Sequence, residues 1–230
     1  MNALERLTLV SHKLQQAEEY GYAVPTLIAV TKTRTPEEIR PVLQAGIIHI
    51  GENRCQEIRE KWHLLQDMQR DRPLALHMIG RLQSNKVKTI IQDVALIHSL
   101  DRMTLAEEIH RQALMHEKRQ DVLVQISPAG EPQKGGIRPE DTEPFLRQVA
   151  RLQGIRVKGL MAIMPLTQDE TVLDQLFGNM QTLFQRMKNL GISGVSMEEL
   201  SMGMSADFHI ALRHGTTMVR LGSAIFGSRA

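Results

Sequence analysis

The stretch LIAVTKTRTPEEI, residues 27–39, combines the end of a buried strand with the start of a helix. Four apolar residues precede Thr31 and Lys32, and the Thr-Pro-Glu-Glu sequence at 35–38 has the cap and first-turn residues typical of a helix N-terminus. A lysine at the end of a buried strand is costly to desolvate unless it is paired, reaches water or takes part in chemistry. Lys32 is therefore the first candidate for a functional residue.

The same strand-then-helix pattern recurs along the whole chain. Short β-branched runs alternate with amphipathic stretches, and the predicted strands are 26–32, 47–53, 74–80, 95–101, 121–127, 155–163, 197–204 and 217–226. Eight such units without a linker predict an α/β protein with a single (β/α)8 TIM barrel over residues 1–230, preceded by an extra N-terminal helix at about 2–20. The alternative is a doubly wound open sheet, which normally has fewer strands and a glycine fingerprint after the first one, whereas TKTRTP has no glycine.

Composition excludes several classes of protein. The 28 Lys and Arg residues are interleaved with 26 Asp and Glu residues, which argues against nucleic acid as the main ligand. The single cysteine, Cys55, excludes an intramolecular disulfide and a multi-cysteine metal site, and it fits a reducing compartment. The first twenty residues form neither a signal peptide nor a membrane span. We therefore expect a soluble cytoplasmic protein that binds neither nucleic acid nor membranes.

Polar residues and glycines gather where the predicted strands end, which is where barrel enzymes place their chemistry. Any one of them is explained by the needs of a turn or a cap. Seven such strand ends together predict a polar functional face, made of Lys32, Gly51 to Asn53, Gly80, Arg81, Gln83, Asn85, Lys86, Ser127, Met164, Pro165, Ser201 to Ser205, Arg220, Gly222 and Ser223.

The last two strand ends are typical of a phosphate site. In barrels a phosphate often lies between the loops after strands 7 and 8. Gly203 and Ser205, the latter as the predicted N-cap of a following helix, end the seventh run. Gly222 and Ser223 follow the eighth, where a backbone without a side chain lets an anion approach closely.

A lysine and a phosphate site on one face indicate a phosphorylated carbonyl compound held as a Schiff base. Two ligands fit: a sugar phosphate, as in an aldolase, or pyridoxal 5′-phosphate. Arg220 lies two residues before Gly222, so both share one strand face and point inward. An arginine beside a pyridine nitrogen leaves that nitrogen unprotonated and the ring a poor electron sink. The alternative role for Arg220 is an ion pair inside the barrel.

Seven motifs carry a resemblance to a known family: AVTKT, HIGENRCQE, HMIGRLQSNK, GEPQKGGI, GLMAIMP, LSMGMSADFHIA and VRLGSAIFG, in this order. Together they resemble the pyridoxal phosphate homeostasis protein family, single-domain relatives of the barrel half of alanine racemases, over about residues 25–228. The resemblance implies a fold-type III barrel with pyridoxal phosphate on Lys32 as an internal aldimine. It also implies cofactor contacts from Asn53, His77, Met202, Ser205, Arg220, Gly222 and Ser223, with Arg220 at the pyridine nitrogen. The implied role is to bind, buffer and deliver the cofactor without established catalysis.

The chain lacks the second base of a two-base alanine racemase, a tyrosine that a second domain supplies opposite the lysine. Its tyrosines, Tyr20 and Tyr22, precede the first strand, and the four residues after Phe226 leave no room for that domain. We therefore expect a monomeric binding protein, with pyridoxal-phosphate-dependent apo-enzymes as partners. The alternative is a monomeric amino-acid racemase with His77 or Cys55 as second base. Lys86 and Lys134 are candidates for a second lysine in cofactor transfer.

Overall fold

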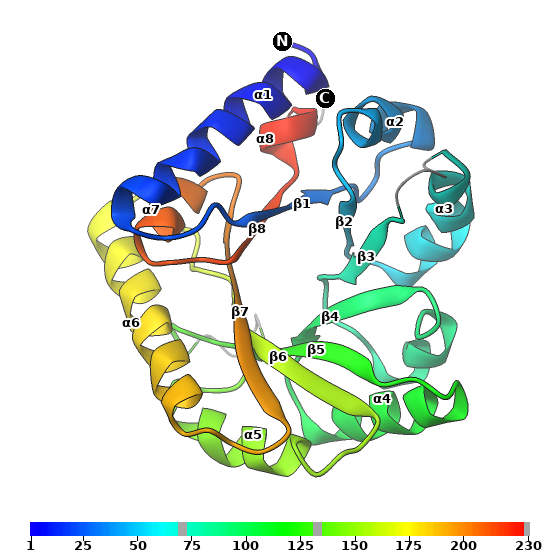
Figure 1. Cartoon of the computed structure of the whole chain (residues 1–230), viewed down its shortest axis with the longest axis vertical. Coiled ribbons are helices and arrows are strands. Elements are labelled where there is room, and N and C mark those ends of the chain that lie inside the picture. Colours follow the sequence, from blue (N-terminus) through cyan, green and yellow to red (C-terminus); the bar gives the residue numbers. More distant parts are fainter. Residues whose placement is uncertain (69–72, 131–134, 228–230) are drawn as a thin grey trace.

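The computed structural model describes residues 1–68, 73–130 and 135–227, and its centre is a closed barrel of eight parallel strands in chain order (Figure 1). The first and last strands pair, with Ile28 opposite Arg220. Closure leaves no sheet edge, so the predicted barrel is confirmed and the doubly wound sheet is wrong. The strands are β1 Thr26–Val30, β2 His49–Glu52, β3 Ala75–Met78, β4 Val94–Leu100, β5 Gln120–Ile126, β6 Ile155–Ala162, β7 Val195–Met204 and β8 Met218–Leu221.

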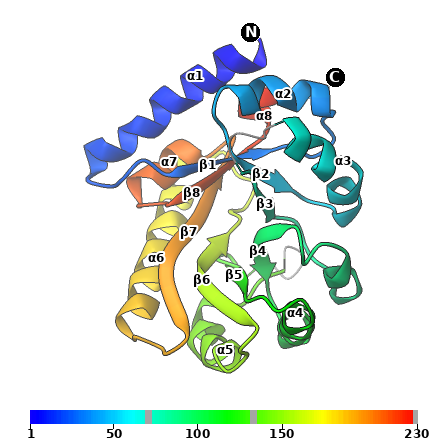
Figure 2. The same cartoon turned by 45° about the vertical axis from the view of Figure 1, so that its right-hand side comes forward.

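Helices surround the barrel and join consecutive strands (Figures 1 and 2). The predicted cap at Thr35 is confirmed, because its hydroxyl accepts from the Glu38 N–H and the Glu38 carboxylate accepts from the Thr35 N–H. The α-helices are α1 Ala3–Leu14, α2 Pro36–Gln44, α3 Cys55–Met68, α4 Met103–Met115, α5 Thr142–Val149, α6 Glu170–Asn189, α7 Phe208–Arg213 and α8 Ser223–Phe226. Among the described residues there are also the 3-10 helices η1 Gln15–Tyr20, η2 Ser84–Thr89 and η4 Pro139–Asp141.

The two ends of the chain differ in how closely they follow the predicted elements. The expected N-terminal helix is confirmed as α1 followed by η1, and α1 packs beside α8. The last predicted strand, 217–226, is too long, because β8 stops at Leu221. From there the N–H groups of Ile225 and Phe226 donate to the Gly222 carbonyl, which turns the chain into α8.

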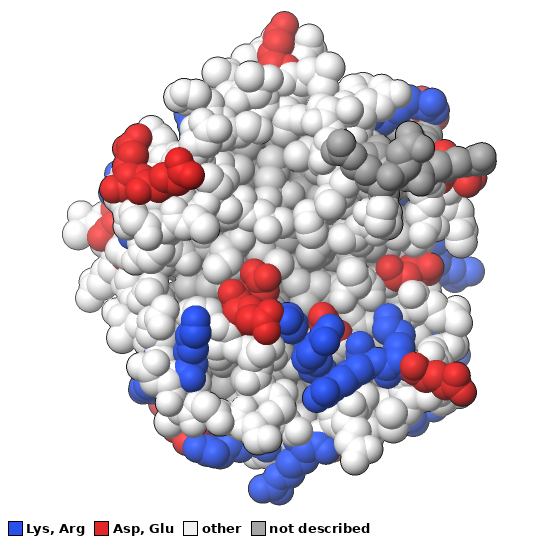
Figure 3. All heavy atoms as spheres, viewed as in Figure 1, with Lys and Arg blue, Asp and Glu red and all other residues white. Residues whose placement is uncertain are grey.

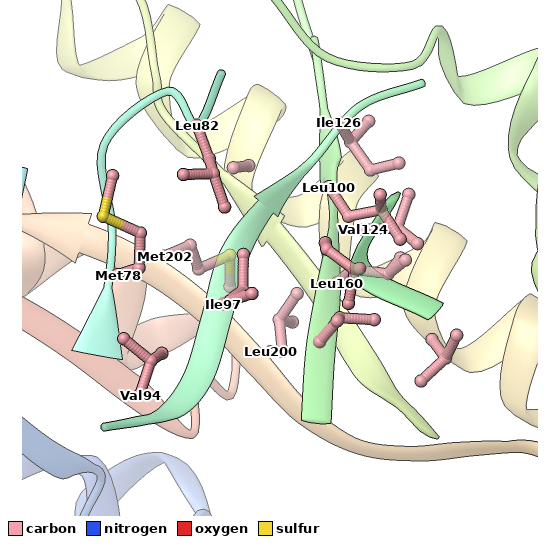
Figure 4. Close-up of a cluster of buried hydrophobic side chains, with 14 of the residues drawn as sticks. Met78, Leu82, Val94, Ile97, Leu100, Val124, Ile126, Leu160, Leu200 and Met202 are labelled. Carbon is pink, nitrogen blue, oxygen red and sulfur yellow. The ribbon is translucent and has the colours of Figure 1, made fainter. Parts of the chain in front are cut away.

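The two faces of the strands have different surroundings. Outward side chains form a large apolar layer against the helices, which includes the residues of Figure 4 such as Ile97, Val124 and Leu160. Inward side chains form a small apolar cluster of Ile28, Leu96, Leu123, Met161 and Met218. On β1 the inward positions are therefore Ile28 and, by the period of two, Val30 and then Lys32 just past the strand end.

Charges of both signs lie next to one another on the molecular surface. On the face seen in Figure 3, the basic side chains gather mainly over the part where β5 and β6 lie, with acidic side chains beside them. Arg156 pairs with Asp121 at 2.6 Å, and Lys158 pairs with Glu198. In the described part of the chain, no helix has the length and apolar character needed to cross a membrane.

Candidate functional site

A cavity of about 480 Å³ opens at the carboxyl ends of the strands and contains Lys32. Six of the eight predicted site residues line it: Lys32, Asn53, Ser205, Arg220, Gly222 and Ser223. The rest of the wall is Val30, Arg34, Ile79, Ile163, Met204, Ala206 and Gly227. These residues come from six strands, β1, β2, β3, β6, β7 and β8, and the segments that follow them, so closure of the barrel is what brings them together.

Lys32 occupies the turn directly after β1. Its side chain is exposed, and its amine makes no hydrogen bond or ion pair with another residue in the described ranges. The next residue, Thr33, has a φ of 61°, a conformation that β-branched residues rarely adopt. Such strain of about 1–3 kcal/mol persists only where neighbouring contacts hold the backbone.

Those contacts come from β2 and α3. The buried Lys61 ammonium donates to the Thr31 carbonyl at 2.7 Å and to the Arg34 carbonyl at 3.4 Å, so it spans the turn that carries Lys32. It also pairs with Glu52 at 2.6 Å and Glu57 at 3.3 Å. The Glu57 carboxylate in turn accepts from the N–H of the strained Thr33.

The sequence-based prediction missed Lys61. A signal was available in the spacing of Glu57 and Lys61, which lie four residues apart on one helix face. Such pairs are common on exposed helices, however, and only the fold shows that this one is buried beneath the β1 turn.

Arg220 points into the barrel, as predicted from its spacing to Gly222. Only 4% of its surface is exposed. Its guanidinium donates to the Ser201 carbonyl at 2.9 Å, the Ser201 hydroxyl at 2.5 Å and the Ala162 carbonyl at 2.8 Å. Burial lowers the pKa of Arg220 to about 10, which leaves it charged at neutral pH. It forms no ion pair with an acid of the described residues, so the alternative of an interior ion pair is not observed.

A row of histidines fills the barrel interior beneath Arg220. His49 Nδ1 lies 2.9 Å from His77 Nε2, His77 Nδ1 lies 2.9 Å from His98 Nε2, and His98 Nδ1 lies 3.1 Å from the Ser201 hydroxyl. Burial lowers the pKa of all three histidines, that of His77 to about 3, so the row is uncharged at neutral pH. The row is thus linked to Arg220 through Ser201.

This row changes the interpretation of His77. The resemblance implies that His77 lies near a cofactor ring, but His77 does not line the Lys32 cavity. It lies two positions before Ile79, which does line it, and both ring nitrogens are engaged by other histidines. A signal for the row was present in the sequence, since three consecutive predicted strands each contain a histidine.

Met202 and Ser205 also lie differently from the sequence-based expectation. Met202 follows the inward Ser201, so its side chain points outward into the apolar helix layer, and it does not line the cavity (Figure 4). Ser205 is not the N-cap of α7, a position occupied by Asp207. Instead the Ser205 hydroxyl accepts from the Gly222 N–H at 3.2 Å and the Ala224 N–H at 3.1 Å. Ser205 therefore joins the loops after β7 and β8.

The chain is similar to known proteins over its whole length. The model of the alanine racemase N-terminal domain matches residues 6–230. The pyridoxal phosphate homeostasis protein of Aquifex aeolicus is 40% identical over the whole of this chain and 99% of its own length. This chain belongs to the pyridoxal phosphate homeostasis protein family. The family member of Pasteurella multocida is 38% identical over 96% of this chain and 93% of its own. A solved structure of PipY from Synechococcus elongatus, with pyridoxal phosphate bound, has a TM-score of 0.85 and 32% identity, covering 98% of this chain and all of that one.

The described residues considered as a second base or a second lysine lie apart from Lys32. Cys55 is the first residue of α3, and it lines a second cavity together with Lys86. Lys134 lies outside the described residues. The Tyr22 ring contacts Gly215, just before β8 begins, and so lies at the opposite end of the barrel from Lys32. Among the residues that the structure describes, no cluster of His, Cys, Asp and Glu could hold a metal ion.

Proposed function

We propose that this chain holds pyridoxal 5′-phosphate covalently on Lys32 and acts in homeostasis of the cofactor, by buffering and delivery, without catalytic turnover. The observation that carries the proposal is the Lys32 amine, unpaired among the described residues and sharing one cavity with Arg220 and Ser205. The PipY structure with pyridoxal phosphate, at 32% identity, supports the same cofactor.

The wall of the cavity fits this group. Its volume of about 480 Å³ lies within the range of small-molecule sites. The amine of Lys32 can condense with the aldehyde of the cofactor and release water. The hydroxyls of Ser205 and Ser223 beside Gly222 suit a phosphate, and the side chain of Arg220 donates hydrogen bonds but accepts none. Bound there, the cofactor supplies an electrophilic carbonyl and an electron sink that Arg220 keeps weak.

The same wall argues against racemisation. Among the described residues that line the cavity there is no tyrosine, cysteine, histidine or carboxylate, so Lys32 has no partner to exchange a proton on the opposite side of a substrate. His77 and Cys55, the second bases of the racemase alternative, lie outside the cavity. This absence favours a binding protein over the amino-acid racemase.

Absorption spectroscopy with borohydride tests the attachment. Protein loaded with pyridoxal phosphate is expected to be yellow, and reduction should fix one cofactor on the peptide that contains Lys32. Lys32→Ala should lose the band, while Lys188→Ala, an exposed lysine on α6, should keep it. A label on another lysine would refute the assignment to Lys32. A protein that takes up no pyridoxal phosphate would instead favour an aldolase.

Isotope exchange separates the carrier from the racemase. The loaded protein is incubated with single enantiomers of several amino acids in deuterated water. We expect neither rapid deuteration at the α-carbon nor inversion, whereas both together would establish an enzyme.

Delivery needs a recipient, so the proposal includes pyridoxal-phosphate-dependent apo-enzymes as partners, in the cytoplasm, and a monomeric carrier. Transfer is measured as the activity that an apo-enzyme regains from loaded protein, compared with the same amount of free cofactor. A regain no faster than that from free cofactor released into solution would remove delivery from the proposal. Light scattering after size exclusion checks for a monomer of 26.0 kDa.

A further inference from the structure

A second and larger cavity, of about 610 Å³, lies beside the cofactor cavity. Its wall is formed by the β2–α3 segment and the start of α3 on one side, and by the β3–η2 segment with η2 on the other. Asn53 belongs to the walls of both cavities. The second cavity therefore contains the polar residues after β2 and β3 that the cofactor site does not use.

Four cationic side chains line this second cavity: Arg54, Arg59, Arg81 and Lys86. Among the described residues of the wall, Glu60 is the only acid, and one of its oxygens accepts from the Gln56 amide at 2.7 Å. None of the four cations makes a hydrogen bond or an ion pair through its side chain with another residue of the described ranges. The cavity thus carries an excess of positive charge.

Five arginines elsewhere in the described chain do have carboxylate partners. Arg34 pairs with Glu38, Arg111 with Glu108, Arg138 with Asp141, Arg147 with Glu143 and Arg156 with Asp121. In those places the chain supplies a carboxylate for each guanidinium. At the second cavity four cations from the β2–α3 segment, α3, the β3–η2 segment and η2 share a wall with one carboxylate and, among the described residues, pair with none, and such a concave concentration of charge attracts anions.

The backbone adds to this field. The 14-residue helix α3 begins at Cys55, in the cavity wall, and the first intrahelical bond there runs from the Ile58 N–H to the Arg54 carbonyl at 3.3 Å. The N–H groups of the first turn precede that bond, and helix N-termini stabilise negative charge.

We propose that this second cavity is a binding site for a small phosphate monoester, separate from the site around Lys32. A phosphate monoester carries a charge of about −1.5 to −2 at neutral pH, which matches the excess of cations, and its oxygens suit the planar donors of arginine. The volume leaves room for an organic group beyond the phosphate.

The second cavity also adjoins the cofactor cavity at a shared wall. A Cβ atom at Gly80 would lie 2.3 Å from the Asn53 carbonyl oxygen, so the segments after β2 and β3 are in direct backbone contact at the shared wall.

The single cysteine provides a readout specific to this site, because Cys55 lines the second cavity and not the first. The rate of its alkylation by N-ethylmaleimide, an uncharged reagent, is followed by intact-protein mass while inorganic phosphate or glycerol phosphate is added at constant ionic strength. We expect saturable protection by both anions and none from chloride. Because Lys32 takes no part in the reaction, the result is independent of the proposed cofactor chemistry.

Variants complete the test. Arg59→Gln with Arg81→Gln removes two exposed guanidinium groups and should weaken protection at least about tenfold, the loss expected for charged hydrogen bonds. Arg40→Gln with Arg186→Gln makes the same change of charge away from the cavity and should keep the protection. The proposal is overturned by no protection of the parent protein, by equal protection from chloride, or by full protection of the Arg59/Arg81 variant. Protection by inorganic phosphate alone would refute the monoester.

Discussion

The ammonium of Lys61 lies 2.7 Å from the carbonyl oxygen of Thr31, one residue before the lysine that we propose to carry the cofactor. Lys61 also pairs with Glu52 and Glu57, and the side chains of Lys61 and Glu52 are 8% and 1% exposed. The conformation of the Lys32 turn therefore depends on a buried cluster that belongs to β2 and α3.

Replacement of Lys61 by Met should remove that support. It leaves Glu52 buried without its cation, so we expect the free energy of unfolding to fall by about 3 kcal/mol or more. The measurement is urea denaturation, combined with the rate at which borohydride traps pyridoxal phosphate on Lys32. Lys188→Met is the exposed control. A loss no greater than that of the control would show that the cluster does not hold the turn.

Thr33→Gly should release the strain next to Lys32. Glycine adopts a φ of 61° without steric cost, so we expect the variant to be as stable as the parent chain or more stable by up to about 1 kcal/mol. The same change at Thr182, an exposed residue within α6, should instead be destabilising, by about 0.3 kcal/mol. Thermal unfolding of both variants gives the comparison. Equal destabilisation of the two would mean that Thr33 is not strained.

Ser205→Ala should loosen the link between the loops after β7 and β8. The N–H groups of Gly222 and Ala224 lose their acceptor, which should cost about 1 kcal/mol and weaken retention of pyridoxal phosphate about fivefold. The dissociation of the cofactor is followed by absorbance after dilution. Ser196→Ala, at the other end of β7, is the matched control and should retain the cofactor like the parent chain. Unchanged retention by Ser205→Ala would exclude Ser205 from the phosphate site.

Gly80→Ala should be strongly destabilising for a purely steric reason. The added methyl group would lie 2.3 Å from the Asn53 carbonyl oxygen, and backbone cannot yield as a flexible side chain does. We expect a loss of at least about 2 kcal/mol. Gly178→Ala is the control, because its Cβ would meet only the edge of the His214 ring, at 3.4 Å, within a helix that favours alanine. Similar stability of the two variants would contradict the close contact.

The buried histidines should make stability fall in mild acid. Burial holds the pKa of His77 at about 3, whereas an unfolded histidine titrates near 6.5, so the unfolded state binds more protons below pH 6.5. Above pH 6.5 the neutral His77 therefore does not lower the free energy of unfolding. As the pH falls from 6.5 towards 3, the free energy of unfolding decreases. At pH 5 the loss should be about 2 kcal/mol for His77 alone.

Urea denaturation at several pH values measures this loss. His77→Gln should reduce the slope of stability against pH between 7 and 5, even if the variant is less stable overall. The exposed His63→Gln should keep the slope. An unchanged slope in His77→Gln would mean that His77 is already charged in the folded protein.

The extent to which the site was predictable differs from residue to residue. Arg220 and Gly222 were placed on one inward strand face from spacing alone, because side chains alternate along a strand, and Lys32 was placed at the end of the first strand, where barrel chemistry lies. The same alternation points Met202 outward, although the motif around it indicated the cofactor. The cap assigned to Ser205 was wrong because the hydroxyl has partners 17 and 19 residues further along the chain, which local sequence cannot reveal.

Hydrophobic periodicity by itself determined the order of strands and helices and hence the barrel, since each pattern reports which face a residue buries. The sequence also placed a lysine at the first strand end. Only the tertiary structure decided that Lys61 lies beneath the Lys32 turn, that three histidines connect through Ser201 to Arg220, and that four cations meet at one cavity. These relationships join side chains from separate strands and helices, and their distances exist only once the barrel has closed.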